Sequence, residues 1–260
     1  LVNLLTARYL GPSNYGLVNY AALYTAFFTS FATLGLSSLL LKDFMDDPEG
    51  AGTTVGTAIA MRLLSSTLSA VSILAIVAAV DRGERLTMTV VALYSMSLIF
   101  QAFDTIQYWF QSRLESKYAT IATSVGYIIV SFYKVLLLVL GKDVRWFAIS
   151  NTIDYAVAAI VFLGLYKWRG GPRLHISPAK GRALLRQSGS FILCGLMVSV
   201  YNCTDRFMLK HLLDEASVGY YATATSLATV WTFVLSAIID SITPGYHAGP
   251  SDGSSAVRPA

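Results

Sequence analysis

The chain has 260 residues, of which 55% are hydrophobic and 13% are charged, and its mean hydropathy is +0.57. Because charged residues make up about a quarter of an ordinary soluble domain, this composition excludes a soluble globular protein and predicts an all-α integral membrane protein. The net charge of +4 does not indicate nucleic-acid binding, since the basic residues collect in loops and no basic cluster is interleaved with aromatic side chains in the manner of an RNA-binding sheet.

The predicted membrane spans are the long apolar runs, since a helix needs about 20 mostly apolar residues to cross the hydrocarbon core. In chain order they are residues 17–41, 55–80, 86–110, 118–140, 146–166, 188–209 and 216–242. We interpret residues 1–7 as the end of an earlier span and residues 8–16 as the turn-rich connector after it. The sequence therefore predicts a helical bundle with short connections.

The longest polar segment between these runs is residues 167–187, which contains six Lys and Arg residues and no Asp or Glu. Lys and Arg are retained on the cytoplasmic side of a membrane, so this loop is predicted to be cytoplasmic, with the turns at 81–85, 141–145 and 211–215 outside. Ser177 followed by Pro178 is a helix-start signal, with Ser as N-cap and Pro at the first helical position. The residues after it are expected to form either a short amphipathic helix on the membrane surface or a solvated linker.

Ionisable residues occur inside several predicted spans, where a charge costs about 2.5–3.5 kcal/mol on insertion scales. Such residues face a cavity or a partner, and matched depths in the membrane suggest two pairs, Lys134 with Asp154 and Arg62 with Asp104. Polar residues at helical spacing form stripes along the same spans, which indicates either helix packing or a cavity wall. The candidates for lining a cavity are Gln101, Tyr127, Asn151 and Asn202.

No catalytic or metal-binding motif is found in the sequence. There is no Gly-rich phosphate loop ending in Lys-Ser or Lys-Thr, and no Gly-x-Ser-x-Gly elbow. The three histidines, His175, His211 and His247, are far apart in the sequence. We therefore predict no enzymatic activity, no cofactor and no metal site.

Three stretches of sequence are distinctive in their order and spacing. They are RYLGPSNYGLVNYA at residues 8–21, IQYWFQSRLESKYATIA at residues 106–122, and TDRFML, ASVGYYATA and ITP between residues 204 and 244. Together they resemble the bacterial polysaccharide transporters and O-antigen (oligosaccharide) flippases of the multidrug/oligosaccharidyl-lipid/polysaccharide exporter superfamily. The resemblance covers residues 8–246, whereas the tail after residue 246 does not resemble the next helix of that family.

The resemblance implies two lobes of about six helices each around a central cavity. We accordingly divide the chain into an N-terminal lobe at residues 1–166, whose first helix is truncated, and a basic cytoplasmic inter-lobe loop at residues 167–187. Residues 188–246 are the first two helices of a C-terminal lobe, and residues 247–260 are a disordered or non-native tail. The chain is thus expected to be a fragment of a larger transporter.

The function that the resemblance implies is translocation of oligosaccharides linked to undecaprenyl diphosphate across the cytoplasmic (inner) membrane, by alternating access, for surface polysaccharide biosynthesis. The residues themselves, rather than a family motif, suggest Arg62, Lys134 and Arg206 as ligands of the anionic substrate. Asp104 and Asp154 are candidates for coupling transport to H⁺ or Na⁺. Further expected partners are membrane lipids and a polysaccharide polymerase or chain-length regulator.

Other functions remain open on sequence grounds. A multidrug or cation antiporter of the same superfamily would favour aromatic and acidic residues in the cavity over cationic ones. A membrane scaffold could assemble polysaccharide enzymes without transporting anything. A glycan polymerase or acyltransferase would need a catalytic constellation in an outer loop, and the predicted loops are too short to hold one.

Overall fold

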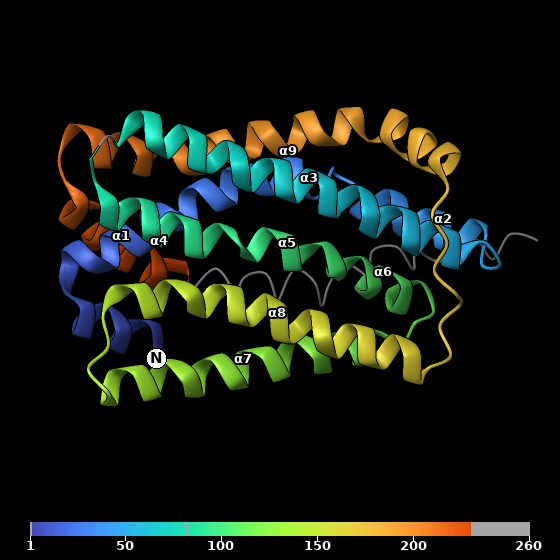
Figure 1. The fold of residues 1–260 in the computed structure, drawn as a ribbon, viewed down its shortest axis with the longest axis horizontal. Helices are drawn as coiled ribbons and strands as arrows, with labels where there is room; N and C mark the ends of the chain where they lie inside the picture. Colours follow the sequence, from blue (N-terminus) through green and yellow to red (C-terminus); the bar gives the residue numbers. More distant parts are fainter. Residues whose placement is uncertain (1, 82, 230–260) are drawn as a thin grey trace, which may run out of the picture.

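The computed structural model describes residues 2–81 and 83–229, and 87% of the structure is helical (Figure 1). The helices are α1 (Val2–Ala32), α2 (Ser37–Asp46), α3 (Ala51–Val80), α4 (Arg85–Ser95), α5 (Ser97–Gln101), α6 (Thr105–Ser112), α7 (Ser116–Val139), α8 (Val144–Trp168) and α9 (Pro178–Leu212). A 3₁₀ turn, η1 (Ala102–Asp104), precedes α6, and residues 215–229 are also helical. No strand occurs in the described ranges, and the predicted all-α class is confirmed.

Five helical segments are long and apolar enough to cross a membrane: α3, the run from α4 to α6, α7, α8 and α9. They match the spans predicted at residues 55–80, 86–110, 118–140, 146–166 and 188–209, so the chain is a multi-pass membrane protein. They lie side by side along the longest axis of the molecule, and the connections gather at its two ends (Figure 1). Only helices can cross lipid in this way, because each satisfies its own backbone hydrogen bonds.

We name the two ends of the bundle after the predicted orientation. The outer end holds the turns at residues 83–84, 140–143 and 213–214, and the inner end holds those at residues 47–50, 113–115 and 169–177. The described part of the last predicted span, at 216–242, reaches residue 229, and the predicted tail at 247–260 lies outside the described residues.

The predicted connector at residues 8–16 is wrong, because helix α1 runs through it. The helix is broken only at Gly11, whose φ of 73° and ψ of 169° suit glycine, and it resumes at Pro12, which lacks a backbone N–H. The Gly-Pro signal is thus a kink rather than a loop. The predicted span at 17–41 is interrupted instead, since Leu34 and Gly35 adopt positive φ and end α1 before α2 begins.

The run from α4 to α6 was predicted as one uniform helix, but it changes its winding at two points. The hydroxyl of Ser95 donates to the carbonyl of Ala92, and that of Ser97 to the carbonyl of Tyr94, where α4 gives way to α5. Such back-bonding by Ser competes with helical hydrogen bonds and bends helices. The second irregularity is η1, which contains Asp104.

The basic segment is part linker and part helix. Ser177 caps α9 by accepting a hydrogen bond from the backbone N–H of Lys180, and Pro178 is the first helical residue, so the predicted helix start is confirmed. The expectation of a short separate helix is wrong. Nothing between residues 178 and 187 interrupts the helix, and these residues are the first turns of the 35-residue α9.

Two buried hydrophobic clusters hold the bundle together. One lies toward the outer end and includes Leu17, Tyr20 and Phe147. The other lies toward the inner end and includes Trp109 and Phe162. Helix α9 contributes Cys203 to the first and Leu184 to the second, so it packs against the preceding helices along most of its length.

Candidate functional site

A polar cavity of about 300 Å³ lies inside the bundle between α1, α4, α7 and α8. Four of the nine candidate residues line it: Tyr127, Lys134, Asn151 and Asp154. Tyr127 and Lys134 are two turns apart on α7, and Asn151 and Asp154 are one turn apart on α8. Their helical spacing and the close packing of α7 against α8 bring the four side chains to one space.

Lys134 and Asp154 provide the charges of the polar cavity. Lys134 Nζ donates to Asn3 Oδ1 at 3.3 Å. The Asp154 carboxylate lies against the backbone of α7 at Gly126, where a Cβ atom would approach Asp154 Oδ1 to 2.7 Å. Within the described chain the two form no direct ion pair, although their charges are near enough to interact. A cation and a carboxylate that do not form an ion pair with each other thus line the same cavity.

Arg62 and Asp104 form a second polar group, deeper in the bundle. The Arg62 side chain on α3 is buried, with a relative exposure of 3%, and its Nη1 donates to Thr105 Oγ1 at 3.1 Å. Its charge interacts with that of Asp104, while its Nε has no partner in the described structure. Arg62 is therefore packed between helices and does not line the polar cavity.

Gln101 and Tyr155 connect these two groups. Gln101 Nε2 donates to the Tyr155 hydroxyl at 3.4 Å, and Tyr155 lines the polar cavity. Gln101 lies three residues before Asp104, and Tyr155 directly follows Asp154 in α8. The resulting series of polar side chains, which we call the polar track, is Lys134, Asp154, Tyr155, Gln101, Asp104 and Arg62. Tyr155 was not predicted from the sequence, where it is one tyrosine in an apolar run.

The remaining candidates, Asn202 and Arg206, lie on α9 and do not line the polar cavity. Asn202 is exposed, and Arg206 is half-buried with its Nε lacking a partner among the described residues. The neighbouring Asp205 accepts a hydrogen bond from the Tyr221 hydroxyl. Arg206 therefore does not share the polar cavity with Lys134 in this structure.

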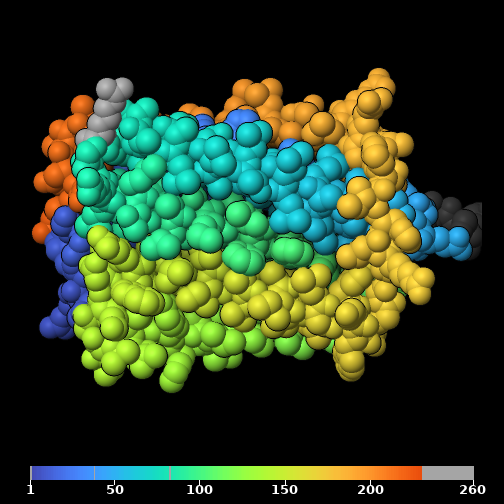
Figure 2. All heavy atoms as spheres, viewed as in Figure 1, coloured from blue at the N-terminus to red at the C-terminus, as the bar shows by residue number. Residues whose placement is uncertain are grey.

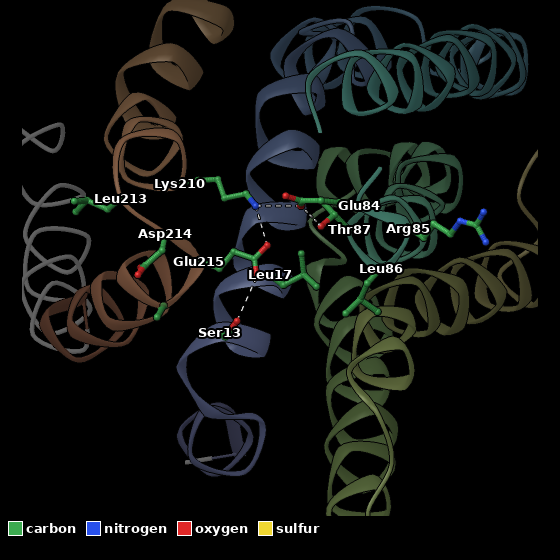
Figure 3. Close-up of a pocket in the computed structure, with 11 residues that line it drawn as sticks. Ser13, Leu17, Glu84, Arg85, Leu86, Thr87, Lys210, Leu213, Asp214 and Glu215 are labelled. Atoms are coloured by element: carbon green, nitrogen blue, oxygen red, sulfur yellow. Dashed lines mark hydrogen bonds and ion pairs between the residues drawn. The ribbon is translucent and has the colours of Figure 1, made fainter. Parts of the chain in front are cut away.

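A larger hollow of about 670 Å³ lies at the outer end, between α1, the start of α4 and the end of α9 (Figure 3). Lys210 of α9 forms ion pairs there with Glu84 at 3.3 Å and Glu215 at 2.8 Å, and only 9% of its side chain is exposed. Ser13 donates to Glu215 and Thr87 donates to Glu84 (Figure 3). We call this set of contacts the outer junction.

Two glycines bring backbones into direct contact at the outer junction. A Cβ atom on Gly16 would lie 1.8 Å from the Glu215 carbonyl oxygen, and one on Gly219 would lie 2.2 Å from the Pro12 carbonyl oxygen. Helix 215–229 therefore packs on α1 at a separation that only glycine permits, as small residues allow between membrane helices.

Glu84 lies outside the membrane-spanning segments, in the turn before α4. The hydrogen bond from Thr87, helped by the charge of Lys210, holds the pKa of the Glu84 carboxyl below its ordinary value, against the opposing effect of burial. The carboxylate is therefore ionised throughout the neutral range. None of Glu84, Lys210 and Glu215 was predicted as a site residue, because their contact depends on how α9 lies against α1.

A bundle of spanning helices with a polar cavity inside it is the architecture of a polytopic membrane protein. A sequence model of the polysaccharide biosynthesis protein family matches residues 1–245. The chain therefore belongs to this family, the polysaccharide and O-antigen flippases of the wider exporter superfamily, and the predicted resemblance is confirmed. Searches of curated proteins and of solved structures found no match. The family supports a role in polysaccharide synthesis or export.

Proposed function

We propose that this protein translocates oligosaccharides linked to undecaprenyl diphosphate across the cytoplasmic membrane, for surface polysaccharide biosynthesis. The observation that carries the proposal is a polar cavity that contains Lys134, inside the bundle of a chain from the polysaccharide biosynthesis family. Lys134 would attract the diphosphate, and the amide and hydroxyl groups of Asn151 and Tyr127 would bind sugar hydroxyls. The residues from 188 onward would belong to a second lobe.

The size of the cavity indicates that the proposed transport needs movement. Small-ligand sites span about 300–1,000 Å³, so the cavity of about 300 Å³ admits a phosphate or one sugar rather than a whole oligosaccharide. Rocking of one lobe against the other would enlarge it and also bring Arg62 or Arg206 to the substrate. Asp104 and Asp154 would then take up and release H⁺ or Na⁺ as the polar track rearranges.

The outer junction supplies the closed end that alternating access requires. Lys210, from the proposed second lobe, pairs with Glu84 of the first, and Glu215 accepts a hydrogen bond from Ser13 of the first. We therefore assign this structure to a state that is closed on the outer side. Release of the substrate outward would require the Lys210–Glu84 pair to break.

Multidrug or cation antiport is the second candidate function. It is favoured by the composition of the polar cavity, where Asp154 lies near Tyr94, Tyr127 and Tyr155. A carboxylate among aromatic rings suits an organic cation better than a diphosphate. The two functions differ in the effect of removing Lys134, which an antiporter for cations does not need.

The test uses the full-length protein in cells that lack their own flippase for the same glycan. Lys134→Gln should strongly reduce the surface glycan made per molecule of folded protein, whereas Lys134→Arg should retain part of it because the charge remains. The control is Lys142→Gln, which removes the same charge from the exposed outer turn after α7. Normal surface glycan with Lys134→Gln would contradict the proposal, and cation export that survives this change would favour antiport.

A further inference from the structure

The segment formed by residues 167–187, which we call the basic strap, crosses the inner end of the bundle (Figures 1 and 2). It is fixed to the helices beneath it by several hydrogen bonds. The backbone N–H of Ser177 donates to Thr57 Oγ1 at 3.0 Å, and that of His175 donates to the Gly52 carbonyl at 3.4 Å. The Tyr166 hydroxyl donates to the Pro172 carbonyl at 2.8 Å. The strap is thus a fixed surface rather than a free loop.

Close backbone packing on α3 holds the same segment. A Cβ atom on Gly52 would lie 2.4 Å from the Arg173 carbonyl oxygen, and one on Gly56 would lie 2.5 Å from the His175 carbonyl oxygen. The strap therefore rests directly on the first two turns of α3. Cations carried by such a support are already positioned, so binding of a ligand costs less ordering than it would on a mobile loop.

The strap carries more positive charge than its neighbours neutralise. Of its six cations, Arg169 pairs with Glu115 and Lys180 pairs with Asp43. The other four are exposed and have no acidic partner within the described part of the chain; they are Lys167, Arg173, Arg182 and Arg186. The strap itself contains no acidic residue, so a net charge remains for an external anion.

Large apolar side chains are exposed between these cations. Trp168 is 72% exposed and Ile176 is 70% exposed, and Leu174 and Leu185 are exposed as well. At the start of α9, Leu184 is buried against the bundle, while Leu185 faces outward with Arg182 and Arg186. Cationic residues interleaved with Trp and Leu are typical of segments that lie at a membrane surface.

The length of α9 places the strap at the depth of the lipid headgroups. Its 35 residues span about 52 Å at 1.5 Å per residue, whereas the hydrocarbon core is about 30 Å thick. The apolar part of α9 begins near Ser188, so the charged first turns extend beyond the hydrocarbon. Trp168, at the end of α8, packs on Tyr118 near this level.

We propose that the basic strap is a binding surface for anionic phospholipids of the adjacent leaflet. The unpaired cations bind the phosphate headgroups, and Trp168, Ile176 and Leu185 enter the boundary between headgroups and acyl chains. An acidic segment of a soluble protein would neutralise the charge of the strap but would leave these apolar side chains in water. The exposed apolar side chains therefore favour phospholipid over a soluble protein as the ligand. This surface is separate from the polar cavity and does not depend on the transported substrate.

The test measures which lipid contacts Trp168. The full-length protein is reconstituted in vesicles that contain either brominated phosphatidylglycerol or brominated phosphatidylcholine at the same fraction, since bromine quenches tryptophan on contact. The difference between the parent protein and Trp168→Phe isolates the signal of Trp168. The difference between the parent and Trp146→Phe gives a control for an exposed tryptophan at the outer end of α8.

We expect phosphatidylglycerol to be preferred at Trp168 and not at Trp146. The preference should fall about fivefold for each of Arg173, Arg182 and Arg186 changed to Gln and should weaken as salt is added. Arg173→Gln, Arg182→Gln and Arg186→Gln combined should remove it. If this combination does not fold, Arg186→Gln alone on the exposed face of α9 should show the fivefold loss.

The matched control is Arg145→Gln, which removes a charge at the outer end and should leave the preference at Trp168 unchanged. Equal quenching of Trp168 by the two lipids would overturn the proposal. So would a preference that survives the loss of the strap arginines, or an equal preference at Trp146.

Discussion

The contact between Gly219 and Pro12 predicts that a single methyl group opens the outer junction. In Gly219→Ala, the new Cβ would lie 2.2 Å from the Pro12 carbonyl oxygen, so the two backbones must separate by more than 1 Å to reach ordinary van der Waals contact. Overpacking of this kind costs about 1–3 kcal/mol. Alanine recovers about 0.5–1 kcal/mol of helix propensity, so the middle of the two ranges leaves a net cost of about 1 kcal/mol, which corresponds to about a fivefold higher open population.

A cysteine at Leu17 reports this opening, because Leu17 is buried beneath the junction and lines the outer hollow. In a full-length protein without other cysteines, Gly219→Ala should raise labelling of Leu17→Cys by an impermeant maleimide about fivefold. The control is Gly189→Ala on α9, where the Cβ meets nothing within 4 Å. Equal labelling in the two variants would refute the proposed backbone contact.

Three further predictions follow from orientation and charge. A cysteine at Pro172 should be labelled only from the cytoplasm and one at Asp214 only from outside, and the reverse pattern would overturn the orientation. The difference in thermal stability between the parent protein and Glu84→Gln should be constant above 4.5, the ordinary pKa of the Glu84 carboxyl. It should be lost as the pH falls through the lowered pKa of the folded state, because protonation removes the ion pair with Lys210. A difference that persists in strong acid would contradict this. Lys134→Ala should lower the amount of folded protein, and adding Asp154→Ala should restore part of it by removing the unpaired charge; losses that simply add would show that the two do not interact.

Hydropathy predicted most of the fold, because an apolar run that crosses lipid satisfies its backbone hydrogen bonds by forming a helix. Runs of apolar residues located α3, α7, α8 and α9, and Ser177 with Pro178 located the start of α9. Hydropathy could not locate the break at Gly35, because apolar residues on both sides of it continue the run. It also read Gly11 and Pro12 as a loop, since the sequence does not show that the chain resumes its helix at once.

The sequence predicted the depth of the candidate residues in the membrane, but not the direction in which each side chain points around its helix. Depth in the span placed Lys134 near Asp154, and both line the polar cavity. The same reasoning gave no rotational position for Arg62, which is packed against Thr105 instead. Contacts such as that of Lys210 with Glu84 depend on which helices are neighbours, and one sequence does not contain that information.

Because α9 is one continuous helix, its two ends move together. The helix has no break between the basic strap at one end and Lys210 at the other, a rod of about 52 Å. A tilt of about 10° around its middle would move each end by about 4–5 Å, given the rise per residue of a helix. The Lys210–Glu84 ion pair cannot persist over a displacement of that size. A movement of the basic strap at the lipid surface would therefore weaken this pair at the outer end.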